Sequence, residues 1–125
     1  MAVQAVITTI LCWTFLSECS VPDDINGFLI DGEKAIAAYK TYCDNAIFTN
    51  KRIIVREAQG LTGKKLNVNI LPYSSIVMWS TENVGKKVDC NTEAELWTNV
   101  GRIQINLKKG VDKEKFDKLM ANVVL

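Results

Sequence analysis

The chain has 125 residues, of which 48% are hydrophobic and 23% charged, and its formal net charge is +1. This length suits one domain that buries roughly two-thirds of the surface exposed by its unfolded chain. A net charge this small excludes a general nucleic-acid-binding surface, which needs a basic face or stripe. Histidine is absent, so the commonest general base and the commonest neutral metal ligand are both missing. We therefore expect a non-enzymatic protein with no catalytic residue, no metal site and no cofactor.

The chain opens with an apolar run, "AVQAVITTILCWTFL". No Lys or Arg precedes this run, although a signal peptide requires one, and its apolar core is shorter than the ~20 residues of a membrane span. We predict instead a helix from Ala2 to Phe15, with a broad apolar face made of Val3, Ile7, Ile10, Leu11 and Phe15. Such a face must be covered by the domain's own core or by another subunit, so these are candidate oligomer-interface residues. Residues 1–31 are assigned to an N-terminal helical segment that is part of the same unit or an oligomer interface.

Residues 32–125 are assigned to the main domain. After a connection with at most a short helix from Asp24 to Ile30, the sequence changes to the alternation of short strands. We place strands over residues 34–41, 43–48, 52–59, 65–71 and 76–83, and the remaining strands within residues 87–108. The predicted count is seven antiparallel strands.

Two of these strands have a clear predicted orientation. The strand at 52–59 is expected to be half-buried, with Ile53 and Val55 on one face and Ile54 on the other face between two arginines. In the strand at 65–71, the inward residues are expected to be Leu66, Val68 and Ile70.

After Gly110 the apolar period becomes that of a helix. Asp112 is the expected N-cap, and the apolar stripe consists of Phe116, Leu119, Met120 and Val123. Strands followed by one helix favour a mainly β fold with helices, built as two orthogonal sheets or a part-open barrel that the last helix caps.

The four cysteines, Cys12, Cys19, Cys43 and Cys90, include no C-x-x-C pair. Without histidine, a closed zinc site would have to take all of them from distant segments. We expect reduced and mostly buried thiols, while a disulfide stays open from the sequence.

Four segments of the sequence are similar to segments of a known protein family: "IFTNKRIIV" (47–55), "QGLTGKK" (59–65), "LPYSSI" (71–76) and "STENVG" (80–85). Together with the strands and the last helix, they are similar to the bacterial pleckstrin-homology (PH) family from about residue 28 to the end, and more loosely in the N-terminal helix. The resemblance implies a PH-like seven-stranded antiparallel barrel capped by a C-terminal α-helix. It also implies a cytoplasmic bacterial protein whose subunits tend to assemble into rings, with no established catalytic or ligand-binding residues. Cys43 stands where the family more often has an arginine, which puts a salt bridge or anion contact there in question.

The stretch "FTNKRIIVREAQGLTGKK" (48–65) superficially resembles a phosphate loop. A Walker motif needs its first glycine at the position of Ala58, a Ser or Thr at that of Lys65, and a helix rather than a strand afterwards. We therefore interpret the stretch as hairpin turns. Lysines of the turns remain candidates for binding an anion or a lipid headgroup, against the simpler interpretation as solvated residues: Lys51, Lys64, Lys65, Lys86 and Lys87.

Two functions remain open from the sequence. The first is a non-enzymatic scaffold or adaptor that self-assembles and binds a protein or peptide partner, through a free strand edge or the groove beside the C-terminal helix. The alternative is a weak anionic-lipid or phosphate-binding module that acts through the lysine-rich turns. Both predict a homo-oligomer in the cytoplasm, no nucleic-acid partner, and at most peripheral contact with a membrane.

Overall fold

The computed structural model describes residues 8–59, 65–82 and 92–125. Its strands are β1 (Thr9–Cys19), β2 (Ala35–Lys40), β3 (Asn45–Thr49), β4 (Arg52–Gln59), β5 (Lys65–Pro72), β6 (Ile76–Thr81), β7 (Thr92–Thr98) and β8 (Gly101–Gly110). Two short 3-10 helices, η1 (Asp23–Gly27) and η2 (Tyr73–Ser75), and one α-helix, α1 (Lys113–Val124), complete the described part of the chain. None of its helices is long and apolar enough to span a membrane.

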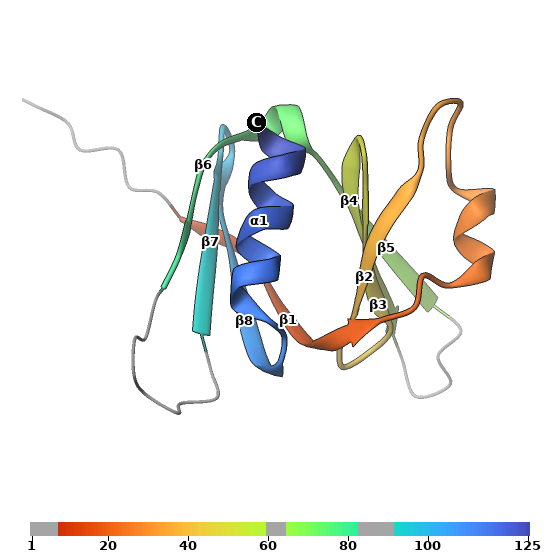
Figure 1. Ribbon diagram of the computed structural model, residues 1–125, viewed down its shortest axis with the longest axis horizontal. Coiled ribbons are helices and arrows are strands. Elements are labelled where there is room, and N and C mark those ends of the chain that lie inside the picture. The colour runs from red at the N-terminus through yellow and green to blue at the C-terminus, as the bar shows by residue number, and fades with distance from the viewer. Residues whose placement is uncertain (1–7, 60–64, 83–91) are drawn as a thin grey trace, which may run out of the picture.

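The strands form one sheet in the order β5-β4-β3-β2-β1-β8-β7-β6. Neighbouring strands are antiparallel except β1 and β8, which run parallel. Among the residues described, the edge strands β5 and β6 do not pair with each other, although η2 joins them directly. Figure 1 shows the sheet folded into two halves, with α1 lying across the side between them. The fold is thus mainly β with a C-terminal helix that covers the opening of the sheet.

The first element is a strand, so the predicted N-terminal helix is wrong over residues 9–15. Trp13 and Phe15 point into the core, whereas Cys12 is exposed and Thr14 is only partly buried. This is the period of two that a strand requires. The segment is also rich in β-branched and aromatic residues, which pack well on a sheet. The rest of the predicted helix, residues 2–7, lies outside the described residues.

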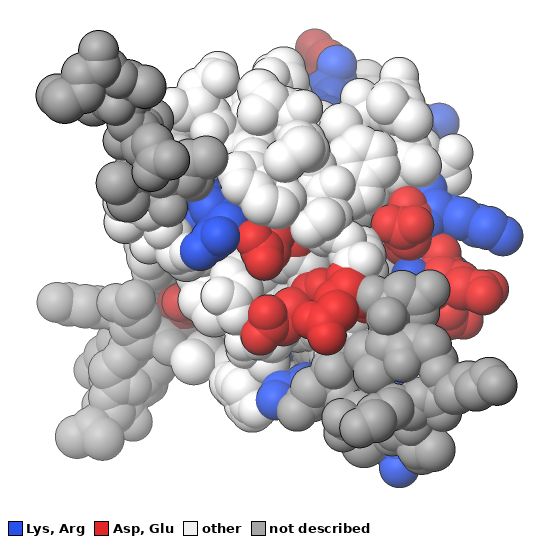
Figure 2. Space-filling view, turned by 90° about the vertical axis from the view of Figure 1, so that its left-hand side faces the viewer, with Lys and Arg blue, Asp and Glu red and all other residues white. Residues whose placement is uncertain are grey.

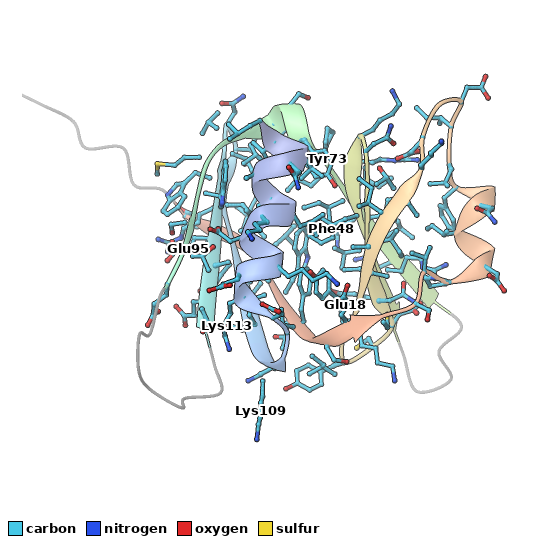
Figure 3. All side chains as sticks on the ribbon, in the orientation of Figure 1. Glu18, Phe48, Tyr73, Glu95, Lys109 and Lys113 are labelled. Carbon is cyan, nitrogen blue, oxygen red and sulfur yellow. The ribbon has the colours of Figure 1, made fainter. Side chains whose placement is uncertain are left out.

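The main core lies between the two halves of the sheet and α1. The ring of Phe15 stacks on Tyr39 with centroids 5.2 Å apart. Phe48 and Phe116 meet both of these rings edge-on, at 5.7 to 6.2 Å. Figure 3 shows Phe48 pointing into this space. The core therefore joins β1, β2, β3 and α1 through four aromatic side chains.

The prediction for α1 is confirmed. The Oδ1 of Asp112 accepts a hydrogen bond from the Lys115 amide at 3.2 Å, which is an N-cap. Phe116 and Met120 are fully buried in the main core. Leu119 and Val123, the other residues of the predicted stripe, pack against its border.

A second, smaller core covers the outer face of β2, β3 and β4. It consists of Ile25, Ala38, Ile47 and Ile54. Arg56 holds η1 over this face, because its Nη1 lies 3.0 Å from Asp24 Oδ2 and its guanidinium carbon 5.9 Å from the ring centre of Phe28. The prediction of a half-buried β4 is therefore wrong: residues 53–56 are buried on both faces, since the segment before β2 covers the outer one.

The predicted orientation of β5 is also wrong. Leu71 enters the main core, whereas Ile70 is 47% exposed. Ile70 pairs with Ile54, which faces the outer side, and Val68 packs there against the second core. The side chain of Leu66 lies outside the described residues.

Candidate binding groove

The strand β2 has a short open edge. Its neighbour β1 pairs with it only over Ser17–Cys19, opposite Ala38–Lys40. After Cys19 the chain turns away towards η1, so the first three residues of β2, Ala35–Ala37, have no strand on that side in the part of the chain described. The ladder with β1 therefore leaves the backbone of Ala35–Ala37 unpaired on this side, and the ladder with β3 has a register shift within the same three residues.

A groove of about 250 Å³ lies between this part of β2 and α1. Its lining residues are Glu18, Ile36, Ala37, Tyr39, Lys115, Lys118, Leu119 and Asn122. The apolar members include Ile36, which is 50% exposed. Tyr39 is almost fully buried, and this burial raises the pKa of its hydroxyl to about 12, so the phenol stays neutral. The groove thus combines an apolar surface, charged margins and an unpaired strand edge.

One ion pair closes the groove on the side of β1. Lys115 Nζ lies 2.8 Å from Glu18 Oε2 and donates a hydrogen bond to Oε1 at 3.0 Å. The carboxylate raises the pKa of the Lys115 ammonium, first through this hydrogen bond. Figure 3 shows Glu18 on the side of the molecule where β1 passes α1 and β2. The contact ties α1 to β1 beside the groove.

A buried carboxylate fixes the segment that leads into β2. The side chain of Glu33 is fully buried; its Oε2 accepts from Arg52 Nε at 2.8 Å and from Thr49 Oγ1 at 2.6 Å. Its Oε1 accepts from Arg52 Nη2 at 3.0 Å and from the Ile30 amide at 3.1 Å. The hydrogen bonds from Arg52 lower the pKa of Glu33 to about 2 against the opposing effect of burial. The loop before β2 is therefore anchored to the hairpin of β3 and β4.

Asn50 adds a second attachment at the same place. Its Oδ1 accepts from the Lys34 amide at 2.8 Å, and its Nδ2 donates to the Gly32 carbonyl at 3.0 Å. The hydroxyl of Tyr73 in η2 donates to the Thr49 carbonyl at 2.7 Å, and burial raises the pKa of that phenol. These contacts hold the open end of β2, and with it the groove, in a fixed position.

The comparison with known proteins agrees with this architecture. A family model for the bacterial PH domain matches residues 6–124. The chain belongs to the bacterial PH domain family. It is 39% identical to the uncharacterized protein YjqA of Bacillus subtilis (strain 168) over 82 residues, which cover 66% of this chain and 65% of YjqA. It is 31% identical to the uncharacterized protein YozO of the same organism over 88 residues, covering 70% of this chain and 75% of YozO.

Solved structures show the same PH fold. A DUF1696 family protein with a PH domain from Shewanella loihica PV-4 superposes with a TM-score of 0.78 at 31% identity, over 87% of this chain and 97% of that chain. A PH domain from Shewanella amazonensis SB2B gives 0.67 at 34% identity, over 82% and 83% of the two chains. A PH-domain-containing protein from Exiguobacterium sibiricum 255-15 gives 0.56 at 17% identity, over 90% and 62%, which shows the fold alone.

The two described lysines of the candidate anion-binding turns lie far apart. Lys51 is exposed in the turn between β3 and β4, and Lys65 begins β5. In the ladder of β4 and β5, Arg52 pairs with Pro72 and Gln59 with Lys65, so Lys51 and Lys65 belong to opposite ends of these strands. At about 3.3 Å per residue, the two backbone positions are more than about 20 Å apart. Lys64, Lys86 and Lys87 lie outside the described residues.

The candidate interface residues of the N-terminal segment fall into three groups. Phe15 is fully buried in the main core, and Leu11 is partly buried and packs against that core. Ile10 is 44% exposed on β1. Val3 and Ile7 lie outside the described residues.

The outer face of β1, β8 and β7 is a polar network. Arg102 lies 3.2 Å from Glu95 and donates to Thr9 Oγ1 at 2.8 Å, and Gln104 donates to Glu93. Figure 3 shows Glu95 on the side of the sheet away from α1. Within residues 8–59, 65–82 and 92–125, no cluster of acidic and cysteine side chains could hold a metal ion.

The prediction of mostly buried thiols is wrong for two of the described cysteines. Cys12 and Cys43 are exposed and Cys19 is partly buried, and all three are free thiols. Cys12 is exposed because it alternates with Trp13 on β1, and Cys43 because it lies at the turn between β2 and β3. Cys90 lies outside the described residues.

The sequence predicted a groove beside the last helix, but it did not predict that β2 forms the other side of this groove. Lys118, Leu119 and Asn122 follow from the helical period of α1. Ile36 and the open edge of β2 depend on where β1 leaves β2, and no local pattern indicates that point. The nearest signal is Pro22, because a proline after a strand disfavours continued pairing.

Proposed function

We propose that this PH domain is a non-enzymatic scaffold or adaptor that self-assembles and binds an extended peptide segment of a partner protein. The observation that carries the proposal is the open edge at Ala35–Ala37 next to the groove along α1. An extended peptide can add to such an edge by main-chain hydrogen bonds, while a neighbouring groove receives alternate side chains. Its cytoplasmic location is part of the same proposal.

The dimensions of the groove suit a short segment. Three open residues of β2 accept a strand of about the same length, roughly 10 Å at 3.3 Å per residue. The apolar surface of Ile36, Ala37 and Leu119 fits one aliphatic side chain of the bound segment. Because the buried Glu33 anchors the loop before β2, this side of the groove is formed before the partner arrives, which reduces the entropic cost of binding.

The placement of the two described lysines favours a peptide over a lipid as the ligand. A multiply charged headgroup needs several cations that converge within a few ångströms. Lys51 and Lys65 start from opposite ends of the same two strands. Liposome co-sedimentation distinguishes the anionic-lipid alternative from peptide binding.

The test of the proposal is a selection from a displayed library of random heptapeptides. Selected peptides, labelled with a fluorophore, should bind the wild type in a saturable manner by fluorescence anisotropy. Ile36→Asp should weaken that binding at least about tenfold, since it places a charge in the apolar groove. The control is Val100→Asp, because Val100 is 81% exposed and does not line the groove. Peptide binding equally unaffected by both substitutions would contradict the groove.

Co-sedimentation with liposomes tests the alternative. We expect no binding to vesicles containing phosphatidylserine at low or at moderate salt. Binding at low salt that disappears as salt rises would support the anionic-lipid module instead, because surface electrostatic attraction is screened within a Debye length of about 10 Å at 0.1 M salt.

A further inference from the structure

The charged side chains that line the groove beside α1 do not balance. They consist of one acid, Glu18, and two bases, Lys115 and Lys118. Lys115 is neutralised by Glu18, because its Nζ lies 2.8 Å from Glu18 Oε2. Lys118 forms no ion pair with any residue that the structure describes. The lining of the groove therefore carries a net positive charge, and Lys118 is its source.

The neighbouring acids of α1 do not neutralise this charge. Glu114 lies four residues before Lys118, a spacing that allows an ion pair on a helix, but the two form none. Asp117 contacts the strand on the other side of the helix: its Oδ1 accepts from Thr81 Oγ1 at 3.1 Å and from Trp79 Nε1 at 3.4 Å. The exposed ammonium of Lys118 is therefore available to an anionic group of a ligand.

Asn122 places a second hydrogen-bond donor beside Lys118. The two lie four residues apart on α1, so their side chains are neighbours on one face of the helix, and both line the groove. An ammonium and an amide N–H can donate to the two oxygens of one carboxylate. A hydrogen bond between an ammonium and a carboxylate is about twice as strong as one between neutral groups. This rim of the groove thus fits a carboxylate.

The apolar surface of the groove lies next to these donors. Leu119 follows Lys118 on α1, and Ile36 lines the groove from β2. Ile36 falls within the register shift of the β2–β3 ladder and is half-exposed, as expected where a bulge redirects a side chain. From Lys115 to Asn122 the helix rises about 10 Å, which equals three residues of an extended segment at about 3.3 Å each. One short segment can therefore reach both the donors and the apolar surface.

Acidic side chains of the protein gather on a different face. Figure 2 shows them on the face that lies on the side of β6 and β7, and in Figure 1 α1 lies between these strands and β2. Strand β7 contributes Glu93 and Glu95 to that side. An anionic segment meets like charges there, whereas at the groove it meets Lys118. The distribution of charge therefore favours the groove as the place where an anionic segment binds.

We propose that the groove binds an acidic peptide segment, whose carboxylate accepts from Lys118 and Asn122 while an aliphatic side chain packs on Ile36 and Leu119. The inference rests on the peptide binding proposed above and names the class of peptide. The carboxylate belongs either to an Asp or Glu of the segment or to its C-terminus. An acidic residue of the segment lies two positions from the aliphatic one, because alternate side chains of an extended segment point to the same side.

The first test is the composition of the selected peptides. The selection uses two libraries of random heptapeptides, one of which is displayed with a free C-terminus. Peptides selected on the wild type should contain more Asp and Glu than Lys and Arg, or should depend on the free C-terminus. Each peptide is then synthesised with Asn or Gln in place of its acid and, separately, with an amidated C-terminus. The change that weakens binding at least about tenfold identifies the source of the carboxylate.

A charge reversal tests the contact with Lys118. Lys118→Glu should weaken binding of the selected peptide at least about tenfold. The same peptide without its recognised carboxylate should bind the wild type and this variant within about twofold of each other, because the interaction that couples them is gone. Circular dichroism confirms that each variant is folded.

Lys109→Glu is the matched control. It makes the same change in net charge, but Lys109 does not line the groove, and Figure 3 shows it pointing away from the body of the protein. This variant should keep the affinity within about twofold, since screening weakens an exposed charge beyond a Debye length of about 10 Å at 0.1 M salt.

The outcomes separate this inference from the proposed function. Peptides that bind in a saturable manner and are weakened by Ile36→Asp, but not by Lys118→Glu, keep the groove and overturn the acidic class. An equal loss of affinity in Lys118→Glu and Lys109→Glu also overturns the contact, because it reports only the overall charge of the protein. The absence of saturable binding from either library overturns both proposals.

Discussion

The side chain of Glu33 has no solvent exposure, and each of its two carboxylate oxygens accepts two hydrogen bonds. Its pKa of about 2 lies below the ordinary value of 4.5. Because the folded state lowers this pKa, the ionised group stabilises the fold above pH 4.5, and this stabilisation is lost as the pH falls towards 2. The free energy of unfolding, measured with urea, should therefore decrease over this range.

Glu33→Gln tests the same residue directly. The substitution should lower the free energy of unfolding by about 3 kcal/mol at pH 7, since it leaves the charge of Arg52 without its partner. It should also flatten the dependence on pH between 4.5 and 2. Asp31→Asn is the matched control, because Asp31 is an exposed acid two residues away and should have little effect. An equally steep acid dependence in both variants would contradict the role of Glu33.

Gly101 begins β8 with a φ of +151°, a conformation that favours glycine. A Cβ at this position would lie 2.7 Å from Ile10 Cγ2 and 2.9 Å from the Thr8 carbonyl oxygen. Gly101→Ala should therefore destabilise the fold by about 1 to 3 kcal/mol, because backbone strain and overpacking act together. Thermal unfolding measures the effect. Gly27→Ala is the control: no atom lies within 4 Å of its added Cβ, and it should change the melting temperature much less.

At the scale of elements, α1 completes the barrel. Phe116 is fully buried and meets the rings of Phe15, Tyr39 and Phe48. Phe116→Ala should cost about 3 to 5 kcal/mol, the usual effect of removing a core aromatic ring. Lys118→Ala, on the exposed side of the same helix, should stay within about 0.5 kcal/mol. Equally mild effects in chemical denaturation would show that α1 is not needed to close the sheet.

The same helix shows what the sequence could predict. Its N-cap Asp112 and its apolar stripe are local signals, so the start and the buried face of α1 were predicted correctly. The strand at 102–108 was equally clear, since Ile103, Ile105 and Leu107 alternate with polar residues and are all buried. Where a hydrophobic period lies within one element and one face of that element is solvated, the sequence is sufficient to predict the element and its buried face.

Elements whose conformation or burial depends on distant segments were predicted less well. The run around Trp13 fits a helix or a strand, because nearly every residue is apolar or small and neither period stands out. Its strand conformation depends on two neighbours, β2 and β8, that come later in the chain. For the same reason the burial of Ile54 could not be predicted, since η1 covers it from a distant segment. The groove depends on the same long-range arrangements, so its β2 side could not be predicted from the sequence.

At the scale of the whole molecule, β1 joins the two halves of the sheet. It pairs with β2 on one side and with β8 on the other, and no other strand pairing within the described residues links the two halves. Removing residues 1–19 should therefore unfold the domain instead of releasing a separate N-terminal segment. Circular dichroism and amide NMR dispersion of the truncated chain measure this. A folded 20–125 fragment would show that residues 32–125 form the unit on their own.

The pairing of β1 with β8 also constrains when the protein can fold. Arg102 Nη2 donates to Thr9 Oγ1 across 93 residues of sequence, and ladders between such distant segments form slowly because a long loop must close first. During translation, β1 is synthesised well before β8. The nascent chain must therefore carry β1 without this parallel neighbour until β8 has been synthesised, and an apolar strand face that stays exposed in this way favours binding by chaperones.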